Sequence, residues 1–214
     1  MIFDHNENFL TKTETQCDLI QLNDSLQYVL QYTNWPLSPS IPHELTTISI
    51  NLKRTTHTPI EEKWTGVSGR LRASNDGKIL VRQQDYIIWN EEVPEYIKKL
   101  VGSLEKEHNF QAGRVRFSNL KPMVCLNTHA DSEQRFHLAI TTNPHVFFYN
   151  NTFKEKNTQY SSIDQLHNFS GVGYHIPVDG FFYKSNTLFS HTAVNSGWSD
   201  RIHLVVDICS FDHL

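Results

Sequence analysis

Two histidines, an aspartate and an arginine lie close together in "LNTHADSEQRFHLAITTN", residues 126–143, a stretch that otherwise has the pattern of β-strand. Within it, His129 and Asp131 are two positions apart, so they would project from one face if "LNTHAD" ends as a strand. An imidazole beside a carboxylate offers two ligands to a divalent metal ion. With one more histidine they would form the two-histidine, one-carboxylate set, with open coordination positions, that suits non-haem Fe(II) oxygenases.

The third ligand must come from another strand, and His191 in "LFSHTAVN", residues 188–195, is the best candidate. A jelly roll could bring the two segments together, because its sheets fold sequence-distant strands over one cavity. The chain has 12 histidines, which is many for its length and favours a metal site without locating it.

An arginine follows His191 at a spacing that matters for the open coordination positions. In many enzymes with such a site 2-oxoglutarate chelates the iron, and its far carboxylate meets a fixed cation. Arg201 lies ten residues after His191 (201 − 191), and its planar guanidinium stays charged and binds carboxylates in a bidentate way. Alternate positions of "RIHLVVDIC", residues 201–209, share a face, so Arg201 and His203 would face the cavity together.

Three further side chains could complete a cosubstrate site. Arg135 and His137 repeat the spacing of two, so this second arginine could hold the metal-bound carboxylate of the cosubstrate. Ser118 in "RVRFSNL" could add a hydroxyl donor. The alternatives are ordinary: Arg135 and His137 would form an exposed strand face, and Ser118 would need no special reason. His203 fits a partly buried, hydrogen-bonded strand histidine better than a ligand.

Two helices are expected in the N-terminal half. "NDSLQYVLQY", residues 23–32, has an apolar face and can be capped by Asn23 or Asp24. "VPEYIKKLVGSLEKE", residues 93–107, has the strongest apolar stripe in the chain. Residues 45–54 alternate as a strand does, and the polar residues 57–78 predict a long loop that could act as a lid.

After Gly113 the pattern changes to seven or eight short strand-like runs separated by turn residues. Many short strands after a helical start predict a mainly β sandwich or jelly roll with helices packed outside. We expect a single domain over residues 1–214, with a helix-containing part and lid loops in 1–112 and the β core in 113–214.

The composition narrows the class of protein. With 38% hydrophobic and 20% charged residues, the chain fits an ordinary globular protein, and a net charge of −4 argues against nucleic acid or an anionic membrane as a partner. The three cysteines match no zinc or disulfide pattern, so we expect reduced thiols in a cytoplasmic protein. The sequence shows neither a signal peptide nor an apolar run of the about 18 residues that a membrane helix needs.

The motifs "RVRFSNLKP", "HAD…RFHLAITTN" and "HTAVNSGWSDRIHLVVDI" resemble the aspartyl/asparaginyl β-hydroxylase family, which also resembles bacterial free-proline cis-hydroxylases. The resemblance covers residues 113–209 well and the N-terminal half poorly. It implies a double-stranded β-helix (a cupin-like jelly roll), Fe(II), 2-oxoglutarate and O2. His129 and His191 match the iron histidines of the family. The groups that match its 2-oxoglutarate site are Arg201 and Ser118 at the distal carboxylate, with Arg135 and His137 near the iron-bound end.

Two positions distinguish this chain within the resemblance. Some animal members have glycine where this chain has Asp131, so the complete ligand triad is more like that of the free amino-acid hydroxylases. A glycine that usually follows the proline of "NLKP" is Met123 here. The family divides between aspartyl or asparaginyl residues of polypeptides and free amino acids. The compact form and the complete triad favour a free amino acid or another small molecule.

The prediction is therefore an Fe(II)/2-oxoglutarate-dependent dioxygenase that hydroxylates an unactivated C–H bond, with His129, Asp131 and His191 as iron ligands. The main alternative is a non-catalytic, cupin-like module in which the same triad holds a metal or a small molecule. A metal-dependent isomerase or hydrolase on the same scaffold is a third, which would have no need for Arg201. The role of residues 55–78 and 151–170 is unreadable from the sequence.

Overall fold

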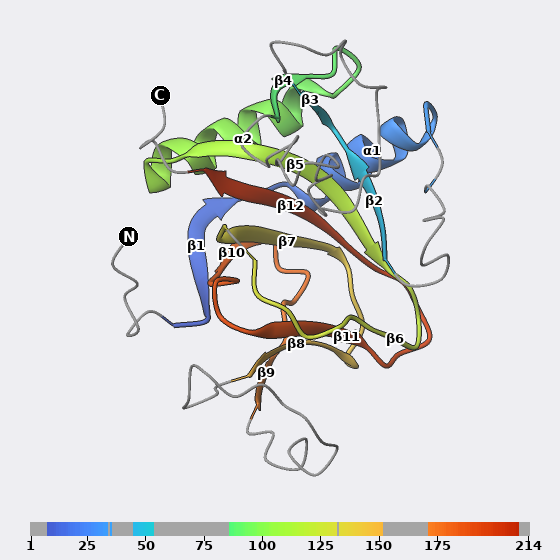
Figure 1. The fold of residues 1–214 in the computed structure, drawn as a ribbon. Helices are drawn as coiled ribbons and strands as arrows, with labels where there is room; N and C mark the ends of the chain where they lie inside the picture. The colour runs from blue at the N-terminus through green and yellow to red at the C-terminus, as the bar shows by residue number, and fades with distance from the viewer. Residues whose placement is uncertain are drawn as a thin grey trace, which may run out of the picture.

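Two antiparallel sheets face each other, and helices α1 and α2 lie on the outer side of the larger one (Figure 1). The computed structural model describes residues 8–33, 35, 45–53, 86–131, 133–151 and 171–209. In order across the larger sheet lie β1 (Leu10–Gln16), β10 (Phe181–Ser185), β7 (Arg135–Thr141), β12 (Arg201–Cys209), β5 (Gln111–Leu120) and β2 (Leu45–Ser49). The smaller sheet has the order β6 (Val124–Cys125), β11 (His191–Asn195), β8 (Val146–Asn151) and β9 (Gly171–Tyr174).

The chain winds between the two sheets from β5 onward. Strands β5, β7, β10 and β12 belong to the larger sheet, and β6, β8, β9 and β11 belong to the smaller one. Most neighbours within the two sheets are therefore distant in sequence, as β12 is from β5 and β7 on its two sides. This winding is that of a double-stranded β-helix, so the predicted fold, a mainly β jelly roll with helices outside, is confirmed.

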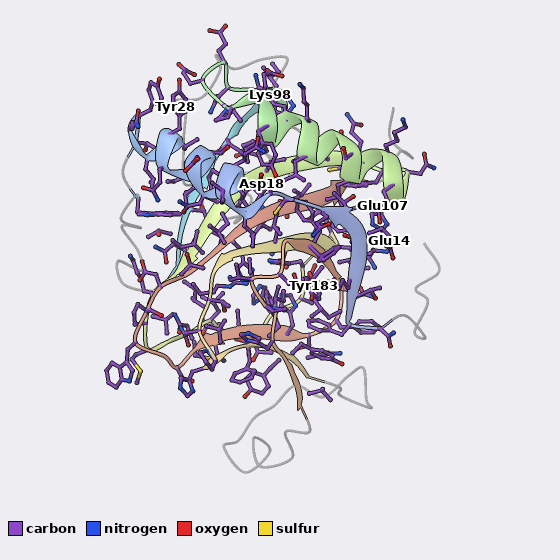
Figure 2. All side chains as sticks on the ribbon, turned by 180° about the vertical axis from the view of Figure 1, so that it is seen from behind. Glu14, Asp18, Tyr28, Lys98, Glu107 and Tyr183 are labelled. Atoms are coloured by element: carbon purple, nitrogen blue, oxygen red, sulfur yellow. The ribbon has the colours of Figure 1, made fainter. Side chains whose placement is uncertain are left out.

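Helix α1 spans Leu19–Leu30, and it begins earlier than the sequence suggested. The predicted caps Asn23 and Asp24 were wrong. The side chain of Asp18 instead accepts hydrogen bonds from the backbone N–H of Ile20 at 2.9 Å and of Gln21 at 3.2 Å. Asp18 satisfies backbone donors that the first turn leaves free, which is what a helix N-cap does. Figure 2 shows it at the start of the helix.

Helix α2, Glu95–His108, matches the predicted helix within two residues. It ends at Asn109, whose φ of 48° places it in the left-handed region that Asn tolerates at helix ends. Near its end, Glu107 accepts hydrogen bonds from the backbone N–H of Glu14 on β1 and from the hydroxyl of Thr15, so α2 is tied to the edge strand (Figure 2).

The main apolar core lies between the two helices and the outer face of the larger sheet. It includes buried residues of α1 and α2 and of four sheet strands, namely Leu22, Leu26, Ile97, Leu104, Ile48, Phe117, Phe136, Leu138, Leu204 and Val206. A smaller cluster lies between the sheets and includes Phe9, Leu120, Ala139, Phe148, Ile176 and Ala193. The face of the larger sheet that points away from the helices is thus only partly filled by apolar side chains.

Three further features of the sequence can be placed against the described residues. The strand expected over 45–54 is divided, because β2 ends at Ser49 and a separate β3, Asn51–Lys53, pairs with β4, Tyr86–Trp89. The predicted lid at 57–78 lies outside the described residues, as does 152–170. Met123 has a φ of 59°, a conformation that glycine adopts readily, which gives a physical reason for the glycine of the resembling family at this position.

None of the three cysteines, all of which the structure describes, forms a disulfide; Cys17 and Cys209 are buried and Cys125 is exposed. None of the described helices has both the length and the apolar character that a membrane crossing requires.

Candidate functional site: a metal triad and a buried arginine

The inner face of the larger sheet carries polar side chains from three adjacent strands. Ser118 on β5 lies opposite His203 on β12, and His137 on β7 lies opposite Val205. Side chains alternate between faces along a strand, so the apolar residues between these positions point to the helices. The predicted facing of Arg201 and His203 away from the helix-packed core agrees with this register.

His129 and His191 are joined through their own backbone, not by a regular strand pair. The N–H of His129 donates to the carbonyl of His191 at 3.0 Å, and the N–H of His191 donates back at 2.8 Å. Strand β6 ends at Cys125, so the expectation that "LNTHAD" continues as a strand was wrong. Asp131 is held instead by its N–H, which donates to the carbonyl of Thr187 at 2.8 Å.

The side chains of His129, Asp131 and His191 converge. One ligand atom from each lies within 4.8 Å of the other two. The Nε2 atom of His129 is 3.8 Å from Asp131 Oδ1, and the Nε2 atom of His191 is 3.5 Å from Asp131 Oδ2. Two imidazole nitrogens and one carboxylate on a common point make a donor set that could hold a divalent metal ion.

The two imidazoles are fixed in the form that a metal needs. The Nδ1 atom of His129 is 2.7 Å from the carbonyl of Asn127, and that of His191 is 2.9 Å from the carbonyl of Phe189. A carbonyl only accepts, so each Nδ1 carries the proton and donates it. Each Nε2 then keeps a free lone pair directed at the common point, the arrangement usual for metal-bound histidines.

Asp131 is charged in this setting. Burial raises the pKa of its carboxyl group, but the neighbouring side chains of His191, Arg135 and His129 together lower it more, so the pKa lies below its usual value. Arg135 contributes a short ion pair, with Nη1 at 2.6 Å from Asp131 Oδ2. The carboxylate is therefore available as an anionic ligand.

Arg201 is the unusual charge of the site. Its side chain is 2% exposed, and its Nε and Nη2 atoms have no hydrogen-bond partner among the described residues. Burial lowers the pKa of its guanidinium to about 9, so it stays cationic at neutral pH. The ring of Phe148 lies 5.0 Å from its guanidinium carbon. A buried cation without an anion is costly, so an anionic ligand would be strongly favoured here.

Two buried histidines lie next to Arg201. Neither ring nitrogen of His137 or of His203 has a hydrogen-bond partner in the described part of the chain, and the ring centres are 5.8 Å apart. Burial, reinforced by the charge of Arg201, holds the pKa of both imidazoles well below 6.5. Both rings are therefore neutral, and each can still donate one hydrogen bond. The expectation that His203 is hydrogen-bonded was wrong for the described residues.

A narrow cavity of about 60 Å³ connects the triad with Arg201. Its walls come from both sheets and from the loops between them, namely Arg116, Ser118, Leu126, His129, Arg135, His137, Phe148, Thr187, His191, Ala193, Arg201 and Val205. Six of the seven residues selected from the sequence line it, and the seventh, Asp131, is in contact with three of them.

Sequence reasoning missed two charged residues of the site. Asp207 on β12 is fully buried, and its Oδ1 is 2.8 Å from Nε of Arg135 while its Oδ2 pairs with Nη1 of Arg116. The signal was present, since Asp207 is on the same side of its strand as Arg201, and Arg116 is two residues before Ser118.

No protein-family model matches the chain, and no curated protein matches its sequence. Among solved structures it is similar to a prolyl-4-hydroxylase from Pseudomonas putida, with 9% identity, a TM-score of 0.48 and coverage of 94% of this chain and 92% of that one. It is also similar to a viral collagen prolyl hydroxylase from Paramecium bursaria Chlorella virus-1 in complex with 2OG, with 9% identity, a TM-score of 0.46 and coverage of 95% and 97%.

A third similar structure is an oxidoreductase of the 2OG-Fe(II) oxygenase family from Burkholderia pseudomallei, at 12% identity and a TM-score of 0.45, covering 89% of this chain and 76% of that one. Similarity at identities this low is a similarity of fold alone, and a fold does not determine a function. The chemical argument therefore depends on the geometry of the site. The finer resemblance to aspartyl/asparaginyl β-hydroxylases stays a prediction.

Proposed function

We propose that the protein is an Fe(II)/2-oxoglutarate-dependent dioxygenase that hydroxylates an unactivated C–H bond of an amino acid. One observation carries the proposal. A two-histidine, one-carboxylate triad and a buried guanidinium without an anionic partner among the described residues belong to the same narrow cavity. A dicarboxylate that chelates a metal at one end and meets the arginine at the other would satisfy both.

The residues present fit these two groups. His129, Asp131 and His191 supply two neutral nitrogens and one anionic oxygen, which is the donor set for Fe(II) with positions left open. Arg201 and Ser118 supply donors for the distal carboxylate of 2-oxoglutarate. When bound, iron with 2-oxoglutarate and O2 supplies the oxidising chemistry, in which 2-oxoglutarate is decarboxylated to succinate and CO2 and the substrate gains a hydroxyl group.

The chain itself contributes orientation and exclusion of water. Arg201 can hold a carboxylate through two parallel N–H donors, which fixes direction as well as position. Phe148 and Val205, both nearly inaccessible to solvent, line the same cavity and keep it dry. His137 is neutral, so it can donate a hydrogen bond to an oxygen of the cosubstrate without adding charge to the site.

The substrate would approach from the side of His129. The side chain of His129 is 41% exposed, whereas that of His191 is 3% exposed, so the site is open on one side of the triad. An amino acid, free or within a peptide, is the substrate class that we propose, in keeping with the sequence resemblance. We propose neither nucleic acid nor a membrane as a partner.

The test is turnover by protein reconstituted with Fe(II) under anaerobic conditions. After addition of O2, 2-oxoglutarate should be converted to succinate, with further stimulation by one member of an amino-acid and peptide panel. His191→Ala should give no succinate above background, because it removes a metal ligand. If the protein binds the metal but forms no succinate, not even by turnover of 2-oxoglutarate without a substrate, the cupin-like binding module would be favoured instead.

A further inference from the structure

A line of alternating charges extends from the metal triad into the larger sheet. Asp131 pairs with Arg135 on β7, Arg135 pairs with Asp207 on β12, and Asp207 pairs with Arg116 on β5. Asp207 is fully buried, and the side chain of Arg135 is 15% exposed. Buried charges are costly unless they are compensated, and in this line two carboxylates and two guanidinium groups balance.

Arg135 is shared between two carboxylates. Its Nε lies 2.8 Å from Asp207 Oδ1, and its Nη1 lies 2.6 Å from Asp131 Oδ2. The backbone fixes one of these partners, because Asp207 and Arg135 are directly opposite in the β12–β7 register. Asp131, by contrast, belongs to an irregular segment, where its backbone N–H donates to the carbonyl of Thr187.

This sharing has a consequence for the metal carboxylate. An arginine free of other partners would tend to bind Asp131 through two parallel N–H groups and so occupy both of its oxygens. With Nε in an ion pair with Asp207, Arg135 contacts Oδ2 of Asp131 through Nη1, and Oδ1 of Asp131 lies 3.8 Å from Nε2 of His129. A metal ion at the triad could then take Oδ1 without displacing the arginine.

We infer that Asp207 is a positioning residue that acts through Arg135 to keep one oxygen of Asp131 free for the metal ion. The inference rests on the proposed metal site, but it concerns a residue that does not touch metal, cosubstrate or substrate. Partners of metal ligands that are not themselves ligands often change metal affinity by about 10- to 100-fold when they are replaced.

The test measures the affinity of the full-length apoprotein for Mn²⁺ alone by titration calorimetry, without cosubstrate or O2. Asp207→Asn should raise the Kd for Mn²⁺ by about 10-fold or more. Asp207→Glu, which keeps the charge, should recover part of the affinity. Asp179→Asn removes the ion pair between Asp179, in the turn before β10, and Lys12 on β1, and it should leave the Kd unchanged.

A double variant separates positioning from a simple change of charge. Asp207→Asn leaves one uncompensated buried cation, and adding Arg116→Met removes that excess. If the affinity falls only because of added positive charge, the double variant should bind Mn²⁺ like the wild type, which would overturn the inference. If Asp207 positions Arg135, the double variant should stay weak. It also serves where the single variant fails to fold.

Failure of this inference and failure of the proposed function have different signatures. Equal Kd values for the wild type and Asp207→Asn would overturn the inference and leave the proposed function untouched. Wild-type protein whose Mn²⁺ binding is absent, or is unaffected by His191→Ala, would overturn the proposed metal site itself.

Discussion

The two faces of the larger sheet differ although the same strands form both. On the helix-packed face, buried apolar residues such as Phe136, Leu138 and Leu204 contact other apolar residues of one core. On the cavity face, one position away along the same strands, lie Arg135, His137 and Arg201, some of whose polar atoms lack hydrogen-bond partners among the described residues. One face is complete by itself, and the other leaves polar atoms that the proposed ligands would satisfy.

This difference separates stability from function along β7 and β12. Burial of apolar area contributes most of the favourable free energy of folding, so the helix-packed face should dominate stability. The cavity face should lower it, because each buried polar group without a partner costs about 1–3 kcal/mol. Functional sites commonly carry such a cost.

The largest expected effect follows from breaking the apolar face. Phe136 is fully buried, and its ring centre is 5.0 Å from that of Phe110. Phe136→Ala should lower the free energy of unfolding by about 3–5 kcal/mol, because a cavity replaces the ring. Urea unfolding measures this change. The affinity of the folded variant for 2-oxoglutarate should stay close to that of the wild type, and a large loss of affinity would show that the two faces are not separable.

The next largest effect is an increase in the free energy of unfolding, opposite in sign to the first. Arg201→Met should raise the free energy of unfolding of the ligand-free protein by about 1–3 kcal/mol, because it removes a buried charge without a described partner. The same variant should lose about 2 kcal/mol or more of binding energy for 2-oxoglutarate, which is at least about 30-fold in Kd. Calorimetry of the metal-loaded protein and urea unfolding of the apoprotein test the two halves. A destabilised apoprotein would contradict the comparison.

The smallest effect concerns pH. The pKa of His203 is held well below 6.5 in the folded protein by burial and by Arg201, whereas in the unfolded chain it is about 6.5. Below pH 6.5 the unfolded state therefore binds more protons, so stability is complete above that pH and falls as the pH falls. The slope is about 1.4 kcal/mol per pH unit for each such histidine, and His137 contributes likewise. His203→Leu should remove one proton from this slope, measured by urea unfolding between pH 5 and pH 7. A variant with the wild-type slope would contradict a neutral, buried His203.

Periodicity alone predicted much of the fold and the facing of the site. Alternation along residues 201–209 separated Arg201 and His203 from the apolar positions, and the apolar stripe of residues 93–107 predicted α2 within two residues. Both signals are local, because each reflects which side of a single element meets the core. Strand order was accessible only through the family resemblance, since pairings such as β12 with β5 join distant segments.

The missed features are those that depend on distant partners. The sequence offers several acidic or amide residues around α1, and only the fold shows that Asp18 caps it. The contact of Asp207 with Arg135 depends on the β12–β7 register, which no local pattern encodes. His129 reaches the triad through an isolated β-bridge to His191. The sequence therefore identified the right residue, although it assumed a continuous strand that the structure does not have.

That bridge makes the two histidines a single unit. Each donates its backbone N–H to the other's carbonyl, so the spacing of the two backbones is set without an ion. Binding of a metal ion would therefore require little ordering of this part of the chain. The same linkage means that separating residues 126–131 from β11 would withdraw His129 and Asp131 together, while His191 stays paired with β8. The proposed site should then lose its metal ion in one step, so the pairing at the edge of the smaller sheet would control whether the metal ion stays bound.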